Sequence, residues 1–262
     1  MSFPYKHVLL VGATSGIGAA MADKLVDEGV NVIAVGRRQE RLDTFVDKHG
    51  PSRAASIRFD ITDRAGLNDF FNDIRVIRRF PDIDCVFINS GIQSIARLSQ
   101  PETVDMDAFR NEINTNFLGV ADLTMKFLPE LQKKSYPTGL IFTGTHISIL
   151  PAVLMPAYSA SKAALSSFVY CLRQQLRDSS TKVIEIWAPA VQTEIHDYMG
   201  KERGRAIGMP VQSFVEEAFE QFLAGAEDVI VGSVGPEEQY LSLFKSRKEQ
   251  ADDFANLLLS RF

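Results

Sequence analysis

Short apolar runs alternate with longer amphipathic runs along nearly the whole of this 262-residue chain. Continuous apolar runs are typical of strands that are covered on both faces, whereas apolar residues that recur every three or four positions indicate helices. The predicted strands lie at 7–12, 30–36, 54–59, 84–89, 138–145, 182–188 and 228–232. The predicted helices lie at 16–28, 38–48, 63–78, 102–133, 156–179, 211–224 and 238–259. This alternation predicts an α/β fold, a doubly wound (Rossmann) parallel sheet of about seven strands with helices on both faces.

No linker rich in Pro, Gly or Ser divides the chain, so we expect residues 1–262 to form a single domain. Residues 189–210 are the one irregular stretch, because it combines several helix-breaking residues: Pro189, Gly200, Gly204, Gly208 and Pro210. This stretch follows the sixth predicted strand, at the edge where open α/β sheets bind ligands, so we expect a mobile substrate loop at about 190–210. A disordered surface connection explains the same residues equally well.

Charge and composition exclude several classes of function. The net charge is −5, from 28 basic and 33 acidic residues, and no clustered basic face of the kind that binds nucleic acid is evident. No apolar run reaches the roughly 18 residues that a membrane span needs. The two cysteines, Cys85 and Cys171, are too few for a disulfide framework. We therefore expect a cytoplasmic protein that has no metal site and binds neither nucleic acid nor membrane.

Three glycines lie between the first predicted strand and the first predicted helix. Their spacing would let the backbone approach a pyrophosphate closely, while the N-terminus of the helix turns free N–H groups toward the anion. A Walker A loop needs Lys and then Ser or Thr after the last glycine, but Ala19 and Ala20 stand there, which disfavours nucleoside triphosphate hydrolysis. The turn therefore predicts a dinucleotide held by Gly12, Thr14, Ser15, Gly16, Ile17 and Gly18.

Two arginines, Arg37 and Arg38, follow the second predicted strand, which ends at Gly36. A site selective for NAD would present Asp or Glu here to the ribose hydroxyls, and no acid is present. Two guanidinium groups suit the 2′-phosphate of NADP, so the pair favours NADP over NAD. The alternative is an ordinary solvated start to a helix, with Arg41 continuing its basic face.

Tyr158 and Lys162 are four residues apart in a predicted helix and therefore share one face. A phenol is a poor base at neutral pH unless a cation stabilises the phenolate, and Lys162 could supply that charge. In isolation, the pair is as easily an aromatic ring beneath a solvated amine. Thr145, at the end of the fifth predicted strand, offers a hydroxyl that could polarise a carbonyl oxygen. Asn116 falls inside the predicted helix 102–133, where it is either functional or solvated.

Taken in chain order, these pieces resemble the short-chain dehydrogenase/reductase family across nearly the whole sequence. The matching positions are the turn from Gly12 to Gly18, Asp60, Asn89 with Ser90 and Gly91, Asn116, Thr145, Tyr158 with Lys162, and the stretch from Pro189 to Thr193. The resemblance implies that Tyr158 is the general acid/base, and that Lys162 lowers its pKa and holds the nicotinamide ribose. It also implies that Thr145 orients the substrate oxygen and that Asn116 supports a water leading protons to Lys162.

The resemblance assigns further cofactor contacts as well. Asp60 and Ile61 would flank the adenine. The central sheet and adenosine ribose would be bordered by Asn89, Ser90 and Gly91. The carboxamide and phosphates would be held by Val191 and Thr193.

Three positions depart from the family pattern. Thr145 stands where Ser is usual, with Ser148 as a reserve hydroxyl; Ser90 replaces an asparagine; and Ala190 replaces the glycine that usually follows Pro189. We expect a slight reshaping of the nicotinamide pocket. His146 is assigned to structure or to the wall of the substrate pocket, because Tyr158 and Lys162 already account for the proton.

The leading hypothesis is an NADPH-dependent oxidoreductase that reversibly reduces a ketone or aldehyde, with Tyr158 as the proton donor. A non-catalytic NADP-binding redox sensor is the alternative, although a sensor could dispense with Tyr158, Lys162 and Asn116. The predicted pocket wall favours a moderately apolar substrate, because it contains Ile95, Leu98, Leu150, Val153, Leu154, Met155, Ile195 and Met199. An acidic substrate that reaches Arg97, Arg203 or Arg205 stays open.

The resemblance also implies a homodimer or homotetramer that pairs through helices 102–133 and 156–179. An apolar stripe at helical spacing in the second of these helices would be buried in such an interface. The stripe comprises Leu165, Phe168, Val169 and Leu172. The alternative is that this stripe faces only the sheet of its own chain.

Overall fold

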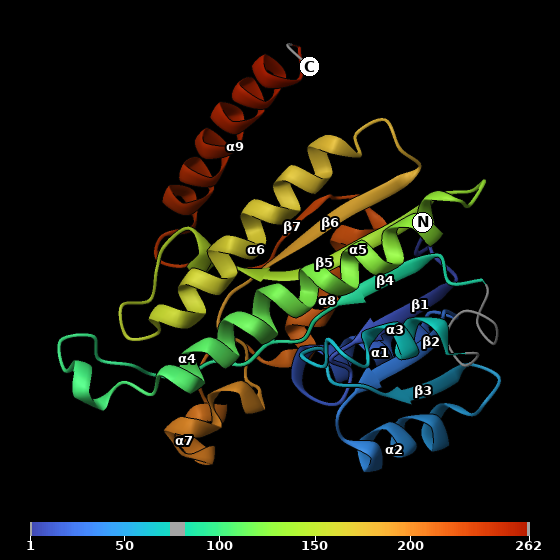
Figure 1. The fold of residues 1–262 in the computed structure, drawn as a ribbon, viewed down its shortest axis with the longest axis horizontal. Helices are drawn as coiled ribbons and strands as arrows, with labels where there is room; N and C mark the ends of the chain where they lie inside the picture. Colours follow the sequence, from blue (N-terminus) through green and yellow to red (C-terminus); the bar gives the residue numbers. More distant parts are fainter. Residues whose placement is uncertain (1, 74–81, 261–262) are drawn as a thin grey trace.

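The computed structural model describes residues 2–73 and 82–260. Their strands form one seven-stranded sheet in which every neighbouring pair is parallel, in the order β3-β2-β1-β4-β5-β6-β7 (Figure 1). The strands are β1 (His7–Val11), β2 (Asn31–Gly36), β3 (Ala54–Arg58), β4 (Cys85–Ile88), β5 (Thr138–Thr145), β6 (Thr181–Ala188) and β7 (Asp228–Ile230). The strand order reverses between β1 and β4. The predicted doubly wound parallel sheet is confirmed.

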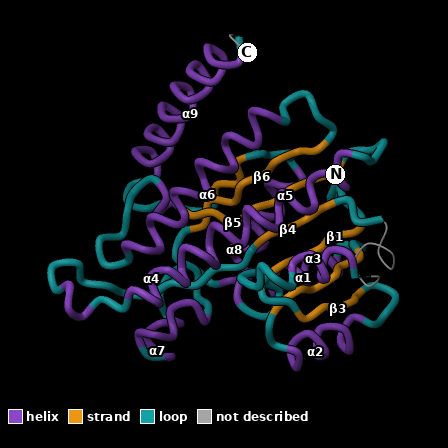
Figure 2. Tube along the Cα trace, viewed as in Figure 1, coloured by secondary structure: helices purple, strands orange, loops and turns teal. Residues whose placement is uncertain are grey.

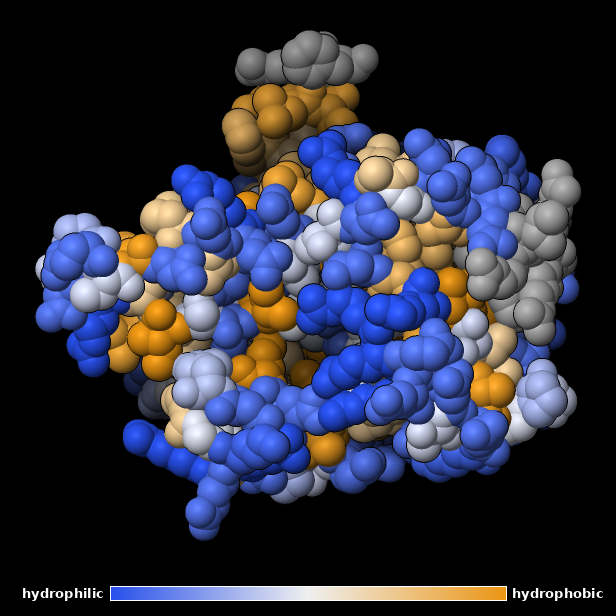
Figure 3. Space-filling view, turned by 60° about the horizontal axis from the view of Figure 1, so that its bottom comes forward, coloured by the Kyte–Doolittle hydropathy of each residue, from blue (hydrophilic) through white to orange (hydrophobic). Residues whose placement is uncertain are grey.

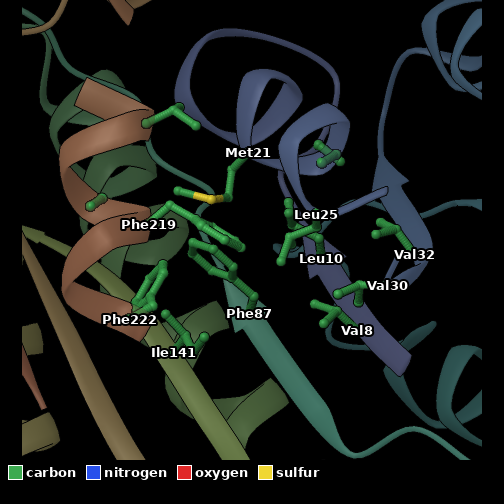
Figure 4. Close-up of a cluster of buried hydrophobic side chains, with 14 of the residues drawn as sticks. Val8, Leu10, Met21, Leu25, Val30, Val32, Phe87, Ile141, Phe219 and Phe222 are labelled. Atoms are coloured by element: carbon green, nitrogen blue, oxygen red, sulfur yellow. The ribbon is translucent and has the colours of Figure 1, made fainter. Parts of the chain in front are cut away.

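Helices cover both faces of the sheet, and each face has its own apolar core. Val8 and Leu10 of β1 point into a cluster with α1 (Gly16–Asp27), α2 (Gln39–His49) and α8 (Val211–Leu223). Leu9 and Val11 point into the opposite cluster with α3 (Leu67–Asn72), α5 (Gly119–Gln132) and α6 (Pro156–Gln175). In the first cluster, Met21 and Phe219 extend from the helices toward Leu10 and Phe87 on the strands (Figure 4). Because successive side chains of a strand point to opposite faces, a strand between two cores must be apolar throughout.

The predicted helix 102–133 consists of successive segments of different winding. A 3-10 turn at Pro101–Thr103 precedes α4 (Met106–Ile113), a π-helical turn at Asn114–Leu118 follows it, and α5 completes the run. Asp105 caps α4, since its carboxylate accepts hydrogen bonds of 2.9 Å from the N–H groups of Asp107 and Ala108. The π turn is the segment that carries Asn116, and apolar periodicity gives no sign of it.

Other boundaries also differ from the sequence prediction. The predicted helix 156–179 ends as α6 at Gln175, whereas the last helix, α9 (Glu237–Leu259), begins and ends close to prediction. Within the predicted helix 63–78, α3 covers residues 67–72, and residues 74–78 lie outside the described part of the chain.

The stretch 189–210 contains a 3-10 helix (Glu194–Met199) and α7 (Lys201–Arg205), where the sequence predicts a loop alone. Its two ends are joined by backbone hydrogen bonds. The Gln192 N–H donates to the Met209 carbonyl at 2.9 Å, and the Met209 N–H donates to the Ala190 carbonyl at 3.0 Å. The segment therefore leaves and rejoins the body of the protein at one point, above the carboxyl ends of the strands.

The apolar stripe of α6 belongs to the core of its own chain. Leu165, Val169 and Leu172 are buried in the cluster that they share with α5, and Phe168 packs against it. Most of the stripe therefore faces its own sheet, and Phe168 is only partly buried. α9, in contrast, projects from the body of the protein beside α6 (Figure 2). Among the described residues, no helix combines the length and apolar character needed to span a membrane.

Candidate active site

A cavity of about 400 Å³ opens at the carboxyl ends of β1, β4, β5 and β6. It lies where the strand order reverses, the place at which open α/β sheets bind ligands. Seen from the side of α2 and α7, hydrophilic side chains surround a hollow with apolar side chains in its depth (Figure 3). Most of the predicted site residues line the cavity, namely Gly12, Thr14, Ser15, Gly16, Ile17, Arg37, Arg38, Asp60, Ile61, Asn89, Ser90, Gly91, Thr145, Tyr158, Lys162, Val191 and Thr193. Gly18 and Asn116 do not line it.

The backbone of the glycine turn lies so close to neighbouring segments that side chains larger than glycine would clash there. Gly12 has a φ of +89°, and a Cβ there would lie 2.7 Å from the Ser90 backbone nitrogen. A Cβ on Gly18 would overlap the Gly12 carbonyl oxygen, and one on Gly16 would lie 3.0 Å from the Cβ of Thr193. α1 begins at Gly16, and Ser15 is at its N-cap position, but the Ser15 side chain makes no hydrogen bond to the N–H groups of the helix. Its first N–H groups therefore suit an anion such as a pyrophosphate, so the turn fits the predicted dinucleotide.

A group of arginines lies on the glycine turn. Arg38 donates from Nε to the Thr14 hydroxyl at 3.1 Å and from Nη2 to the Ser15 hydroxyl at 2.5 Å. Arg41 donates from Nη1 to the Thr14 carbonyl at 2.9 Å. Glu194 accepts from both arginines, and hydrogen bonds from Arg41 and then Arg38 hold the pKa of its carboxyl at about 2, against the effect of burial. This end of the cavity is therefore built to hold an anion.

Asp60 follows β3 at the same end of the cavity. Its carboxylate accepts hydrogen bonds from the Thr62 N–H at 3.0 Å and the Thr62 hydroxyl at 2.8 Å, and it lies 3.7 Å from Nη1 of Arg37. Partial burial raises the pKa of Asp60, but the bonds from Thr62 and the charge of Arg37 outweigh it, so the pKa lies below its ordinary value. The Arg37 side chain remains 60% exposed.

Tyr158 and Lys162 share the face of α6 that lines the cavity, and both are buried, with exposures of 8% and 3%. Lys162 Nζ donates to the Thr143 carbonyl at 2.8 Å and lies 5.9 Å from the centre of the Tyr158 ring. Burial raises the pKa of Tyr158 above its ordinary value, and the charges of Glu112 and Tyr198 add to the rise. Burial lowers the pKa of Lys162 to about 8, opposed by the charge of Glu185. The resemblance implies that Lys162 lowers the pKa of Tyr158, and that effect stays a prediction.

Of Thr145 and Ser148, Thr145 is the one that lines the cavity. Its Oγ1 donates to the Ala188 carbonyl at 2.8 Å and accepts from the Ile147 N–H at 3.4 Å. Ser148 donates to the Thr145 carbonyl at 2.6 Å and does not line the cavity. Of the two candidates for orienting a substrate oxygen, Thr145 therefore has the position, and its hydroxyl must turn from Ala188 to donate.

His146 is a buried structural residue. Its Nε2–H donates to the Val231 carbonyl at 2.9 Å, and its ring packs edge-on against Tyr240 with 4.3 Å between the ring centres. Burial lowers the pKa of His146, so the ring is neutral. His146 is absent from the lining of the cavity, in keeping with a structural role and not with the pocket wall.

Asn116 is fully buried and joins three segments. Its amide nitrogen donates to the Ile92 carbonyl at 2.8 Å and to the Ser161 hydroxyl at 3.0 Å, and its carbonyl oxygen accepts from the Ile92 N–H at 2.8 Å. The side chain thus ties the loop after β4 to the π turn and to α6. With both amide protons used, Asn116 acts through its side chain as a positioning residue for Gly91, Ile92 and α6.

The residues predicted to form the substrate wall line the cavity only in part, and one small group of hydrogen-bonded polar side chains accompanies them. Of the predicted wall, Met155, Ile195 and Met199 line the cavity, joined by Ile92, Ile147 and Ile207. The other predicted wall residues do not line it, namely Ile95, Leu98, Leu150, Val153 and Leu154. Gln93 Nε2 donates to His196 Nδ1 at 2.9 Å and to the Tyr198 hydroxyl at 3.0 Å. Arg97, Arg203 and Arg205 do not line the cavity either.

Residues 6–204, three quarters of the chain, match the short chain dehydrogenase family. The chain belongs to the short-chain dehydrogenase family. This short-chain dehydrogenase is 31% identical to serine 3-dehydrogenase of Rhizobium radiobacter over 195 residues, which are 71% of this chain and 72% of the relative.

Solved structures share the fold of this short-chain dehydrogenase. A short-chain dehydrogenase from Sphingobium yanoikuyae in complex with NADPH has a TM-score of 0.81 at 23% identity, covering 95% of this chain and 96% of its own. A short chain dehydrogenase/reductase from Burkholderia phymatum in complex with NAD has a TM-score of 0.81 at 18% identity, covering 96% of both chains. Both cofactors therefore occur in proteins of this fold.

Sequence reasoning missed four residues in or beside the site of this short-chain dehydrogenase. Arg41 was named only as part of a solvated basic face, although it lies three positions beyond Arg38, a spacing that places two residues on one side of a helix. Glu194, Gln93 and Glu112 gave no signal, because each depends on contacts between distant segments. Glu112 is buried, is hydrogen-bonded by the Ser94 hydroxyl, and influences the pKa of Tyr158.

Proposed function

We propose that this short-chain dehydrogenase is an NADPH-dependent oxidoreductase that reduces a ketone or aldehyde to an alcohol, reversibly. The observation that carries the proposal is the buried phenol of Tyr158, with the Lys162 amine beside it, in the same cavity as the glycine turn. A dinucleotide on the turn and a small molecule at the apolar end would meet at this pair.

Each side chain has a defined task in the reaction. NADPH supplies, when bound, the hydride that a carbonyl carbon accepts. Tyr158 gives its proton to the carbonyl oxygen, so the substrate becomes an alcohol and the residue becomes a phenolate that recovers a proton from solvent. Lys162 stabilises that phenolate by its charge, and Thr145 donates a hydrogen bond to the oxygen on which charge develops. Asn116 keeps Gly91 and α6 in register for these contacts.

The preference for NADP over NAD rests on charge at the adenosine end. Gly36 ends β2 where an acid would bind the ribose hydroxyls, and Arg38 is fixed on Thr14 and Ser15 beside it. The bidentate geometry of guanidinium groups suits a 2′-phosphate. The short-chain dehydrogenase from Sphingobium yanoikuyae is in complex with NADPH, which supports the proposal. The protein from Burkholderia phymatum has the same fold and is in complex with NAD, so the fold alone does not select the cofactor and the argument depends on the arginines.

The lining of the cavity favours a moderately apolar carbonyl substrate, because Met155, Ile195 and Met199 lie at its substrate end. The competing proposal is a redox sensor that binds NADP without turnover. Such a sensor needs no buried phenol and ammonium at the cofactor cleft, so the pair favours the enzyme.

The test is a panel of ketones, aldehydes and alcohols, assayed by cofactor absorbance with NADPH and, in parallel, NADH. We expect at least one carbonyl compound to be turned over, with a higher kcat/KM for NADPH. Equal efficiency with NADH would remove the argument from Arg37 and Arg38. Tight NADPH binding without turnover of any compound would favour the sensor.

We further propose that the protein is a homodimer or homotetramer. Because the α6 stripe is buried, the interface would use exposed apolar side chains on the neighbouring α4–α5 run, namely Met106, Leu118 and Met125. Light scattering on wild type and Met125→Glu tests this: we expect an oligomer that the substitution weakens. A wild-type monomer would contradict it.

A further inference from the structure

A carboxylate from a distant segment occupies the arginine group at the adenosine end of the cavity. Glu194 Oε2 accepts hydrogen bonds from Arg38 Nη1 at 2.7 Å and from Arg41 Nη1 at 2.9 Å. Its Oε1 accepts from Arg41 Nη2 at 2.7 Å and lies 3.8 Å from Arg205 Nη2. Both oxygens of one carboxylate are thus engaged by a pair of guanidinium groups.

The arginines are fixed independently of this carboxylate. Arg38 is held by the hydroxyls of Thr14 and Ser15, and Arg41 by the carbonyl of Thr14, all within the glycine turn. Glu194, in contrast, belongs to the 189–210 stretch and is separated from Arg38 by 156 positions in the chain. The two arginines and the carboxylate that they hold therefore come from segments far apart in the chain, and the arginines keep other partners in the glycine turn.

We propose that Glu194 competes with the 2′-phosphate of NADP(H) for Arg38 and Arg41, and so limits how strongly the enzyme distinguishes NADP from NAD. The proposal rests on the assignment of Arg38 to the 2′-phosphate of NADP made above, and it adds Arg41 as a second contact. A carboxylate and a phosphate use the same guanidinium N–H groups, and two anions at one position repel each other. When the phosphate binds, Glu194 retains a partner in Arg205, which already lies nearby.

The competition has a thermodynamic consequence that depends on the 2′-phosphate alone. A ligand that carries this phosphate must displace Glu194, whereas a ligand without it leaves the carboxylate in place. Removing the charge of Glu194 therefore strengthens binding of the first ligand and leaves binding of the second unchanged. Glu194 and Arg38 have side-chain exposures of 29% and 45%, so solvent screens the effect to a moderate size.

The experiment measures calorimetric Kd values of the full-length protein for adenosine 2′,5′-bisphosphate and adenosine 5′-monophosphate. Three proteins are compared: wild type, Glu194→Gln and Glu202→Gln. Glu202 is the matched control, because it lies in α7 of the same stretch, is exposed, and loses the same charge by the same substitution. We expect Glu194→Gln to bind the bisphosphate about tenfold more tightly, a change of about 1.4 kcal/mol, and to bind the monophosphate as wild type does. Glu202→Gln is expected to match wild type with both ligands.

The outcomes separate this proposal from the NADP preference itself. Unchanged or weaker binding of the bisphosphate by Glu194→Gln overturns the competition, and so does equal tightening in Glu202→Gln, which would reveal an effect of net charge. If wild type binds both nucleotides equally, the NADP preference fails. In that case, tighter binding of the bisphosphate than of the monophosphate by Glu194→Gln would still support the competition. Equal binding of the two nucleotides by Glu194→Gln would overturn the competition too.

Discussion

Replacing Asn116 with Ala should destabilise the protein because it removes the amide that joins three segments. The change leaves the Ile92 N–H and carbonyl without their Asn116 partner, whereas the Ser161 hydroxyl still donates to the Tyr158 carbonyl. A buried polar group that loses its partner costs about 1–3 kcal/mol, so two groups cost roughly 2–6 kcal/mol. Ile92 is only half-buried and water can reach part of its backbone, which favours the lower end, about 2–3 kcal/mol.

Urea unfolding followed by circular dichroism measures this change in the free energy of unfolding. Asn114→Ala is the matched control, because Asn114 lies in the same π turn and its side chain is exposed. Its free energy of unfolding should stay within about 0.5 kcal/mol of wild type. Turnover of Asn116→Ala should also fall, since Gly91 and α6 lose their common anchor. Equal stability of the two variants would refute the reasoning that the amide holds these segments together.

Two further predictions concern the proton-transfer groups. Thr145→Ser should retain turnover because it keeps the hydroxyl. Thr145→Val should lose about 10²-fold or more in kcat, the usual effect of removing one donor to a developing oxyanion. Similar rates for the two variants would exclude Thr145 from this role. In the reductive direction, kcat/KM should fall by about tenfold per pH unit above pH 8, because the pKa of Lys162 is lowered to about 8 and the ammonium loses its charge there. Rates that stay flat to pH 10 would show that the Lys162 charge is not required.

Much of the fold could be predicted because most positions of the buried strands are apolar on both faces. β5 and β6 lie between two cores, and their predicted bounds agree with the structure to within one residue. The π turn around Asn116 could not be predicted, because the apolar spacing of a helix continues through it. The stripe at Leu165 and Val169 shows a related limit, since a helix face looks the same whether it packs on its own sheet or on a second subunit.

The candidate site was predictable where residues are close in sequence. Tyr158 and Lys162 are one helical turn apart, so their shared face followed from spacing alone. The position of Glu194 on Arg38 did not, because it depends on how residues 156 positions apart fold together. Burial was equally hidden: the sequence places Lys162 beside Tyr158 but does not show that both groups are buried, which raises the pKa of the phenol.

The most direct test of the central claim is the turnover of Tyr158→Phe, compared with its affinity for NADPH. Phe preserves the buried ring and removes only the proton that the carbonyl oxygen should receive. With a carbonyl compound that the wild type reduces, we predict a loss of about 10²-fold or more in kcat, at an unchanged Kd for NADPH. Undiminished turnover in this variant would contradict the assignment of Tyr158 as the proton donor.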